Sequence, residues 1–141
     1  MTFPVPDRVI RLAAYGIVRR DEEVLLVRAS SSSDVPGTWW LPGGGVEFGE
    51  PPERTVIREV AEETGLEVEV VGQPLILTDL MSVPRRELEL FSVRLCYPVA
   101  VQGGVLRDEV DESTDHAAWL PRATAETLPL LPFVRTALGW G

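Results

Sequence analysis

The sequence is poor in the residues and segments that mark secreted or membrane-embedded proteins. It contains one cysteine among 141 residues, so Cys96 cannot form a disulfide within the chain. In an alternating apolar stretch, a lone cysteine is more often a small buried side chain than a nucleophile. No apolar run approaches the length of about 18 residues that a transmembrane helix needs, and Met1–Arg8 lacks the core of a signal peptide. We therefore expect a cytoplasmic protein that does not enter a membrane.

Positive charge is also scarce. Thirteen basic residues stand against 22 acidic ones, which gives a formal net charge of −9 at pH 7. This charge disfavours non-specific binding to DNA or RNA, so we expect no polymeric nucleic acid among the partners. The sequence shows no internal repeat, linker or low-complexity stretch, and its length has room for one hydrophobic core. We expect a single domain over residues 1–141.

Three glutamates, Glu59, Glu62 and Glu63, are crowded into one short segment. Each residue of a helix advances by about 100°, so the three carboxylates would share one arc of roughly 100° on a helix. Like charges at this spacing destabilise a helix by a few tenths of a kcal/mol per pair, and a hard divalent cation with oxygen ligands would compensate for them. The alternative is a solvated acidic face on a surface helix.

The residues around the glutamates predict the limits of this helix. Prolines at 51 and 52 suit a helix start and Gly65 suits a C-terminal cap, so we expect a helix over Pro52–Thr64. A stripe of apolar residues beside the acidic arc is typical of a helix face packed on a core. The stripe predicted to be buried consists of Val56, Ile57, Val60, Ala61 and Thr64.

A glycine-rich segment precedes the helix at a fixed spacing. From Gly44, five residues lead to Glu50, and seven more lead to Arg58–Leu66. This pattern matches every fixed position of the Nudix box, which reads G, five residues, E, seven residues, R-E-U-x-E-E-x-G-U, where U is a bulky aliphatic residue. The sequence therefore resembles the Nudix hydrolase family. Since its length is about that of the bare Nudix domain, the resemblance covers nearly the whole chain.

The resemblance implies a fold, a reaction and a cofactor. The fold is α+β, a Nudix-type α/β/α sandwich in which helices flank a mixed central sheet. The reaction is hydrolysis of a pyrophosphate bond in a nucleoside diphosphate linked to another moiety, with Mg2+ or Mn2+. Such cations neutralise a pyrophosphate and place a water in line with phosphorus. The implied substrate is a small nucleotide such as an NTP, ADP-ribose or a nucleotide sugar, and the family is compatible with a homodimer.

Within the box, the resemblance implies roles residue by residue. Arg58 and Glu50 form the supporting pair, because the arginine of the family holds the glutamates in orientation. The alternative for Arg58 is a helix-surface ion pair with Glu62, of about 0.3–0.5 kcal/mol. The implied metal ligands are Glu59 and Glu63, assisted by Glu62 directly or through water, and the carbonyl of Gly44.

The box does not settle which residue is the general base, because relatives take it from the box or from a later loop or strand. Glu59 is the first candidate and Glu112, in the acidic stretch 108–116, is the second, with Asp115 of the same stretch as a further candidate. Many relatives have a glutamate where this chain has His116, its only histidine. His116 could act as a base, hydrogen-bond a base or a phosphate, or have no role.

Arginines outside the box are candidates for binding substrate phosphates, which guanidinium groups contact in a bidentate manner. Arg85 and Arg86 lie in a segment, residues 81–86, that we predict to be a loop between two strands. Solubilising surface charge is the alternative for both. Arg94 lies within a predicted strand, where a phosphate contact and an ion pair are equally expected.

The remaining segments predict an α+β fold, because strands surround one helix and short helices follow. Apolar and alternating stretches predict strands at residues 9–19, 24–27, 66–78 (broken at Gly72 and Pro74) and 87–97, and short helices at 124–128 and 131–138. The main functional prediction is a metal-dependent pyrophosphohydrolase. The alternative is a catalytically silent Nudix-like nucleotide-binding or regulatory domain; such domains usually lose a box carboxylate, and none is missing here.

Overall fold

A computed structural model describes residues 5–141 of the chain. Met1–Pro4, which begin the segment predicted to lack a signal-peptide core, lie outside the described residues. The strands are β1 (Asp7–Arg20), β2 (Glu23–Ala29), β3 (Trp39–Trp40), β4 (Gly43–Gly45), β5 (Leu66–Val70), β6 (Leu75–Val83), β7 (Leu88–Gly104) and β8 (Thr114–Pro121). The helices are α1 (Pro52–Thr64), α2 (Arg122–Ala125) and α3 (Pro132–Leu138), with a 3-10 turn, η1, at Pro84–Arg86.

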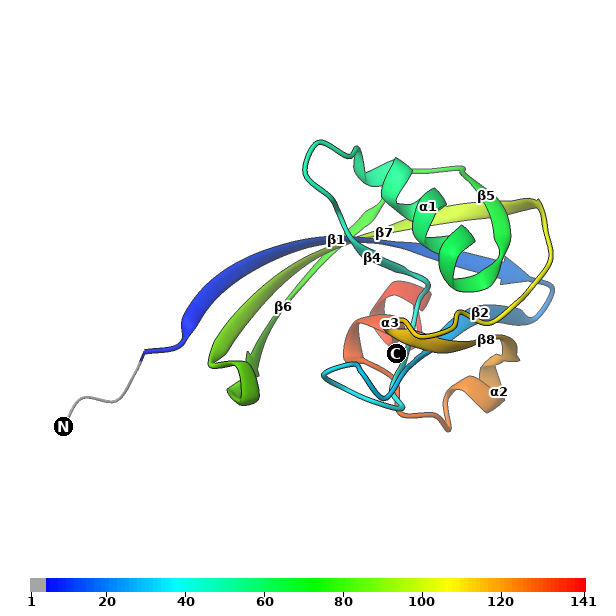
Figure 1. The fold of residues 1–141 in the computed structure, drawn as a ribbon. Helices are drawn as coiled ribbons and strands as arrows, with labels where there is room; N and C mark the ends of the chain where they lie inside the picture. Colours follow the sequence, from blue (N-terminus) through cyan, green and yellow to red (C-terminus); the bar gives the residue numbers. More distant parts are fainter. Residues whose placement is uncertain (1–4) are drawn as a thin grey trace.

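The sheet is mixed, and its centre is the parallel pair β1 and β7, in register from Asp7 opposite Leu88 to Val18 opposite Val99. The other edge of β7 pairs with β6 and β5, and both of these strands are antiparallel to it. β4 lies antiparallel to the middle of β1, and β2 continues from the end of β1 to pair with β3 and β8. Figure 1 shows the first half of β1 projecting with β6 and β7 as an arm beyond the helices.

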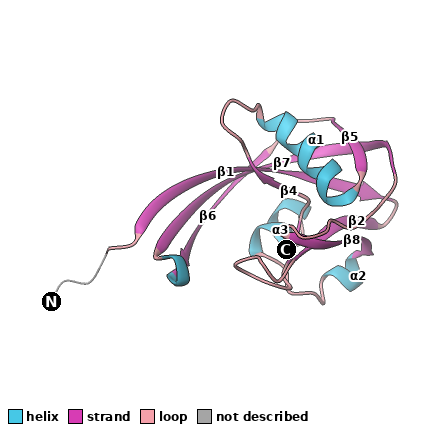
Figure 2. Cartoon of the chain, viewed as in Figure 1, coloured by secondary structure: helices cyan, strands magenta, loops and turns pink. Residues whose placement is uncertain are grey.

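Helices cover both faces of the central strands (Figure 2). Alternate residues of β1 face opposite sides, as a strand requires. Ala14 and Val18 pack with Val56 and Val60 of α1, whereas Ala13 and Tyr15 join a second cluster that contains α3. This layering confirms the α+β class and the prediction of a mixed sheet between helices.

The helix predicted over Pro52–Thr64 has those same limits in the structure. Gly65 caps it in the left-handed region, with φ of 78°, and donates its amide hydrogen to the Ala61 carbonyl. The predicted buried stripe is partly wrong: Ile57 is exposed and Glu63 is buried. The inner face of α1 is therefore rotated toward the acidic arc, which brings a carboxylate into the interior.

Two other local predictions need correction. Residues 81–83, predicted as part of a loop, belong to β6, and only Pro84–Arg86 form the turn to β7. The helix predicted at 124–128 begins and ends earlier, as α2. Cys96 is buried as expected, and no helix within residues 5–141 is long and apolar enough to cross a membrane.

Candidate active site

The glycine strand β4 lies directly against the acidic face of α1. The Gly43 amide donates a hydrogen bond of 2.8 Å to Oε1 of Glu63. Gly44 faces Glu59 so closely that a Cβ atom at position 44 would lie 2.8 Å from the Glu59 carboxyl carbon. A glycine is therefore required at 44 if Glu59 is to keep its position, since any larger residue would displace the carboxylate.

Two carboxylates at this contact are poorly hydrated. Glu63 is only 3% exposed, and burial raises its pKa well above the usual glutamate value, with a further rise from the charge of Glu59 and an opposing effect of the Gly43 amide. Burial also raises the pKa of Glu59, against the lowering effect of the Arg58 guanidinium. The two acids are close enough to influence each other's pKa. Buried acids in contact favour either a shared proton or a bound cation.

Arg58 connects these carboxylates to the loop before the helix. Its Nε and Nη2 atoms donate to the two carboxylate oxygens of Glu50 at 2.8 and 3.0 Å. The Thr55 hydroxyl also donates to Glu50. The Arg58 guanidinium has the larger effect and the Thr55 hydroxyl the smaller one, and together they lower the pKa of Glu50 to about 2. Arg58 Nη1 donates to Glu59 at 2.9 Å and to Glu62 at 3.3 Å. The ion pair with Glu62 is thus the longest of these contacts, and the bidentate pair with Glu50 is the dominant one.

The donor set fits a hard divalent cation. In residues 5–141, no three His, Cys, Asp or Glu side chains are already arranged around a cation position. Arg58 donates a hydrogen bond to one oxygen of Glu59 and to one oxygen of Glu62. Mg2+ typically takes one or two carboxylates and completes its shell with water and substrate oxygens, so a closed protein cage is not required.

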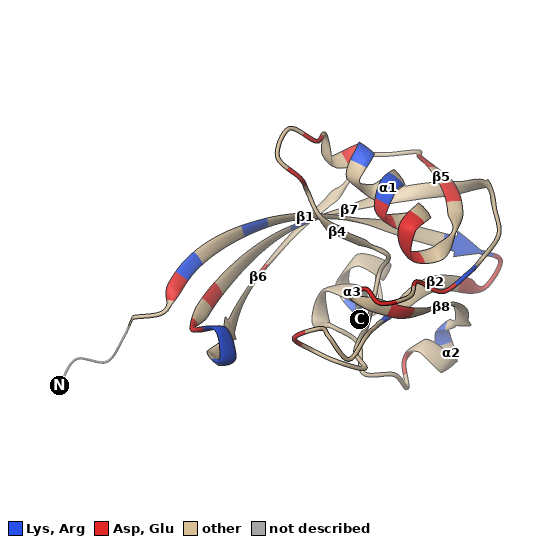
Figure 3. Ribbon diagram, in the orientation of Figure 1, with Lys and Arg blue, Asp and Glu red and all other residues tan. Residues whose placement is uncertain are grey.

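A fourth carboxylate faces this cluster from the loop between β7 and β8, and sequence reasoning did not single it out. Burial raises the pKa of Glu109, and the charges of Glu112, Glu59 and Glu62 raise it further, while the Thr114 hydroxyl opposes them with a hydrogen bond of 3.0 Å. Figure 3 shows acidic residues both on α1 and on this loop. The acidic stretch 108–112 was visible in the sequence, but no spacing rule showed which of its members turns inward.

The structure explains how the loop is held. Arg107 donates to the Glu62 and Ala61 carbonyls at the C-terminal end of α1. The helix dipole also favours a positive charge at this end. His116 lies 2.9 Å from Asp108 through Nδ1, and Asp108 also accepts from the Ala117 amide. In this position His116 anchors the start of the loop and packs edge-on to Trp39.

The predicted base Glu112 is placed differently from Glu109. Its side chain is exposed, and its backbone carbonyl accepts hydrogen bonds from the Ser30 and Ser32 hydroxyls. These contacts tie the loop to the end of β2. The structure therefore brings Glu109, and not the Glu112 carboxylate, close to the box glutamates.

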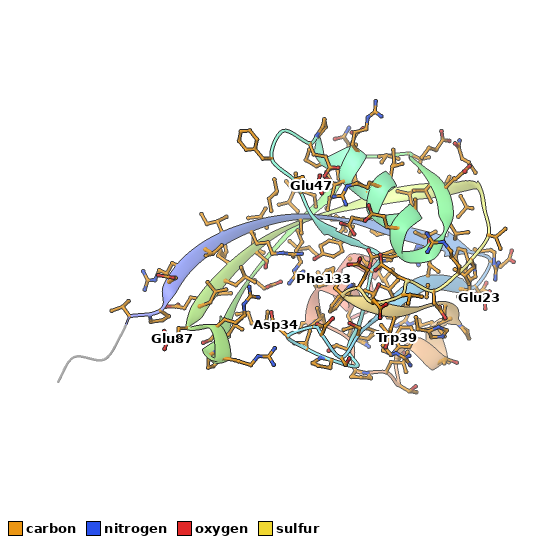
Figure 4. All side chains as sticks on the ribbon, viewed as in Figure 1. Glu23, Asp34, Trp39, Glu47, Glu87 and Phe133 are labelled. Carbon is orange, nitrogen blue, oxygen red and sulfur yellow. The ribbon has the colours of Figure 1, made fainter. Side chains whose placement is uncertain are left out.

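The predicted substrate arginines are all engaged by acids. Arg94 is 6% exposed and donates to Asp79 at 2.7 and 3.3 Å and to the Tyr15 hydroxyl at 2.6 Å. Arg85 and Arg86 donate to the two oxygens of Asp34, at 3.0 and 2.9 Å. Figure 4 shows Asp34 between the body of the molecule and the arm that ends near Glu87.

Arg11 differs from these arginines. It donates to the Tyr15 hydroxyl at 3.2 Å, and no acid in residues 5–141 forms an ion pair with it. Its Nη2 atom would lie 3.9 Å from a Cβ atom placed on Gly45. An arginine without an acidic partner therefore lies beside the glycine strand. Sequence reasoning missed it because the surrounding strand reads as a continuous apolar segment.

Comparisons with known proteins agree with this geometry. The model of the NUDIX domain matches residues 9–138. The chain is 34% identical over 96 residues to an ADP-ribose pyrophosphatase of Methanocaldococcus jannaschii, covering 68% of this chain and 54% of that protein. It is 32% identical over 130 residues to the human 8-oxo-dGDP phosphatase NUDT18, and the match covers 88% of this chain and 37% of that protein. The chain thus spans about half or less of the length of these relatives.

Solved structures show the same fold. A NUDIX hydrolase from Nitrosomonas europaea superposes with a TM-score of 0.75 at 19% identity, covering 92% of this chain and 86% of that one. This likeness confirms the Nudix-type sandwich predicted from the sequence. With the family model matching 9–138 and the box residues assembled at one site, the chain belongs to the NUDIX domain family.

Proposed function

We propose that this protein is a divalent-metal-dependent pyrophosphohydrolase that cleaves a nucleoside diphosphate linked to another moiety. The observation that carries the proposal is the pair of buried Glu63 and half-buried Glu59, which lies against a glycine strand whose Gly43 amide donates to Glu63. Buried carboxylates in contact are unfavourable unless a proton or a cation compensates for them. We therefore propose that the box glutamates bind a cation and do not serve only to make the helix surface soluble.

Glu59, Glu62 and Glu63 would hold Mg2+ or Mn2+, with the Gly44 carbonyl as a further ligand. The cation, when bound, supplies charge neutralisation for the pyrophosphate and a Lewis acid for the attacking water. Arg58 and Glu50 orient the carboxylates, because Arg58 bonds to Glu50 with two donors and to Glu59 with a third. Loss of such an orienting partner typically costs 10- to 100-fold in activity or metal affinity.

Glu109 is the proposed proton acceptor, ahead of Glu59 and Glu112. A base must reach the water and hold a pKa near the working pH, and burial moves the Glu109 pKa in that direction. Glu109 would take a proton from water as its oxygen attacks phosphorus, and the bond to the leaving phosphate oxygen would break. Glu109→Gln should lower kcat strongly, whereas Glu112→Gln, which keeps the backbone contacts to Ser30 and Ser32, is the matched control.

The names of two relatives support the proposed substrate class. One relative is named for ADP-ribose and another for 8-oxo-dGDP, so a small nucleotide containing a diphosphate is the proposed substrate, with NTPs and nucleotide sugars as further members of the panel. A single domain, a cytoplasmic location and a homodimer are proposals that come from the sequence and its resemblance. Separation by size with light scattering tests the homodimer.

The test is a substrate panel with Mg2+ or Mn2+ in which products are identified by mass. Glu62→Gln and Glu63→Gln should each lower turnover by orders of magnitude while the melting transition persists. Full activity in both variants would overturn the metal assignment. Nucleotide binding without turnover across the whole panel would favour the second candidate, a catalytically silent nucleotide-binding domain.

A further inference from the structure

The arm formed by β1, β6 and β7 has one face that the described part of the chain leaves largely uncovered. Alternate residues of a strand face opposite sides, and one set of arm residues lines the cavity beside the loop after β2. The other set faces the side of α1, but α1 packs on the second half of β1, through Ala14 and Val18. Figure 1 shows the first half of β1 extending beyond α1. The outward residues of the arm are therefore open to solvent, and we call this surface the arm face.

Large apolar side chains form a continuous band on the arm face. Phe91 on β7 lies opposite Ile10 on β1 and opposite Leu80 on β6, so these three residues form one row across the arm. The exposed fractions in the band are 75% for Ile10, 68% for Leu80, 65% for Ile76, and 40% for Leu12 and Phe91. Such a band exposes an apolar area on the order of several hundred Å2, which is the upper range for a monomeric protein, and patches of this size mark interaction sites.

A fully exposed phenylalanine stands beside the arm face. Phe48 lies in the loop between β4 and α1, and Figure 1 shows this loop rising on the α1 side of the sheet where the arm begins. The Glu50 amide donates to the Glu47 carbonyl at 2.9 Å and Gly49 has φ of 81°, so these residues form a tight turn with Phe48 near its tip. A backbone hydrogen bond from Val46 to β1 fixes the start of the loop. The turn thus presents an aromatic side chain to solvent in a defined position.

The charges around these two features complement each other. Of the outward residues on the three strands, Arg8 and Glu89 are charged, and they pair at 3.6 Å. The arm face is therefore neutral on a chain whose formal net charge is −9, so two acidic copies can approach each other there with the least repulsion. Arg8, on the same face as Ile10, is 80% exposed, and Glu47, next to Phe48, is 69% exposed. A Phe48 turn seated on the arm face of another copy would bring these opposite charges together.

We propose that the arm face binds a second copy of this chain, with Phe48 of each copy packed on the apolar row that contains Phe91 of its partner. The contact is reciprocal, because each copy has both the projecting turn and the face that receives it, as a two-fold interface requires. A stable interface buries about 800 Å2 on each partner, and the arm face and the turn supply its apolar centre. This inference goes beyond the proposed hydrolysis, and it assigns the dimer a surface that the family resemblance leaves open.

Sedimentation equilibrium of the whole chain measures the dissociation constant of this dimer without substrate or metal. The wild type should shift with concentration between the 15.5 kDa of one chain and twice that mass. Ile10→Glu should weaken the dimer by at least about 100-fold, because it would bury two unpaired charges at the interface. Phe48→Ala should weaken it by at least about 10-fold, as expected for a central aromatic residue. Val101→Glu, at a 43% exposed position near the other end of β7, is the matched control and should dimerise as the wild type does.

A loss of folding would be distinguished from a loss of the dimer. Phe48 is fully exposed in the single chain, so the circular dichroism spectrum of Phe48→Ala should match that of the wild type. A wild type that keeps the mass of one chain at every concentration would overturn the inference. Dimers of Ile10→Glu or Phe48→Ala as tight as those of the wild type would also overturn it, as would an equal weakening by Val101→Glu. Dimerisation that depends on Ile10 and Phe48 would sustain the inference whether or not any substrate is hydrolysed, so its failure and that of the proposed activity are distinguishable.

Discussion

Replacing Gly44 by alanine tests the contact between the glycine strand and the metal-binding face most sharply. The new Cβ would lie 2.8 Å from the Glu59 carboxyl carbon and 2.9 and 3.0 Å from its oxygens. Ordinary van der Waals contact begins at 3.4 Å, so the carboxylate must retreat by about 0.6 Å, which is 3.4 minus 2.8. A displacement of about 1 Å at a reacting centre costs on the order of 100-fold in rate. We expect Gly44→Ala to lower kcat/KM by about 10- to 100-fold.

The fold should survive this substitution. Gly44 does not need a positive φ, and the atoms that collide are at the far end of a side chain, so the backbone of β4 need not move. Alanine also reduces the freedom of the unfolded chain, a gain of about 0.4–1 kcal/mol that offsets part of the strain on Glu59. The melting temperature should therefore stay within a few degrees of the wild type.

The next residue provides the matched control. A Cβ on Gly45 points to the other face of β4 and meets only Arg11 Nη2, at an ordinary 3.9 Å. Gly45→Ala should keep most of the activity in the same assay of product formation. An active Gly44→Ala, or equal losses in both variants, would refute the view that position 44 keeps Glu59 in place.

Three further predictions follow from contacts at the site. Arg58→Gln should lower activity by about 10- to 100-fold at saturating Mg2+, because Glu50 and Glu59 lose their orienting partner; unchanged kcat would contradict this role. Metal-free protein should become more stable as the pH falls from neutral toward 4.5, because the raised pKa of Glu63 favours its neutral form, and Glu63→Gln should flatten this dependence of melting temperature on pH. Below pH 4.5 stability should fall, because the unfolded chain takes up a proton at Glu50 while the folded protein, with the Glu50 pKa lowered to about 2, resists it. Asp34→Asn should lower the free energy of unfolding by less than about 1 kcal/mol in thermal or denaturant melts, because exposed ion pairs contribute little to folding; a larger loss would contradict this.

The sequence predicted the parts of the site that depend on local periodicity. The limits of α1 followed from two prolines and a glycine, and the shared face of the three glutamates followed from the helical repeat. The box spacing then indicated the family, and the NUDIX match over residues 9–138 confirmed it.

The remaining parts depend on contacts between segments far apart in the sequence. Glu63 is buried because β4 returns against α1 and supplies the Gly43 amide, a contact that helical periodicity alone cannot show. Glu109 turns inward because Arg107 and the pair of Asp108 with His116 fix the loop that carries it. Arg94 was ambiguous as a strand residue, and the register of β6 with β7 places Asp79 within its reach.

The central claim is that the box glutamates of α1, of which Glu63 is buried, hold a divalent cation. Titration of Mn2+ into the wild type and into Glu63→Gln, followed by electron paramagnetic resonance of the free ion, tests it without any choice of substrate. Glu63→Gln retains an oxygen that can accept the Gly43 amide hydrogen but removes the buried charge. We expect saturable binding by the wild type and an affinity at least about 10-fold weaker in the variant, a loss of roughly 1.4 kcal/mol. Equal affinity of the two proteins for Mn2+ would contradict the account.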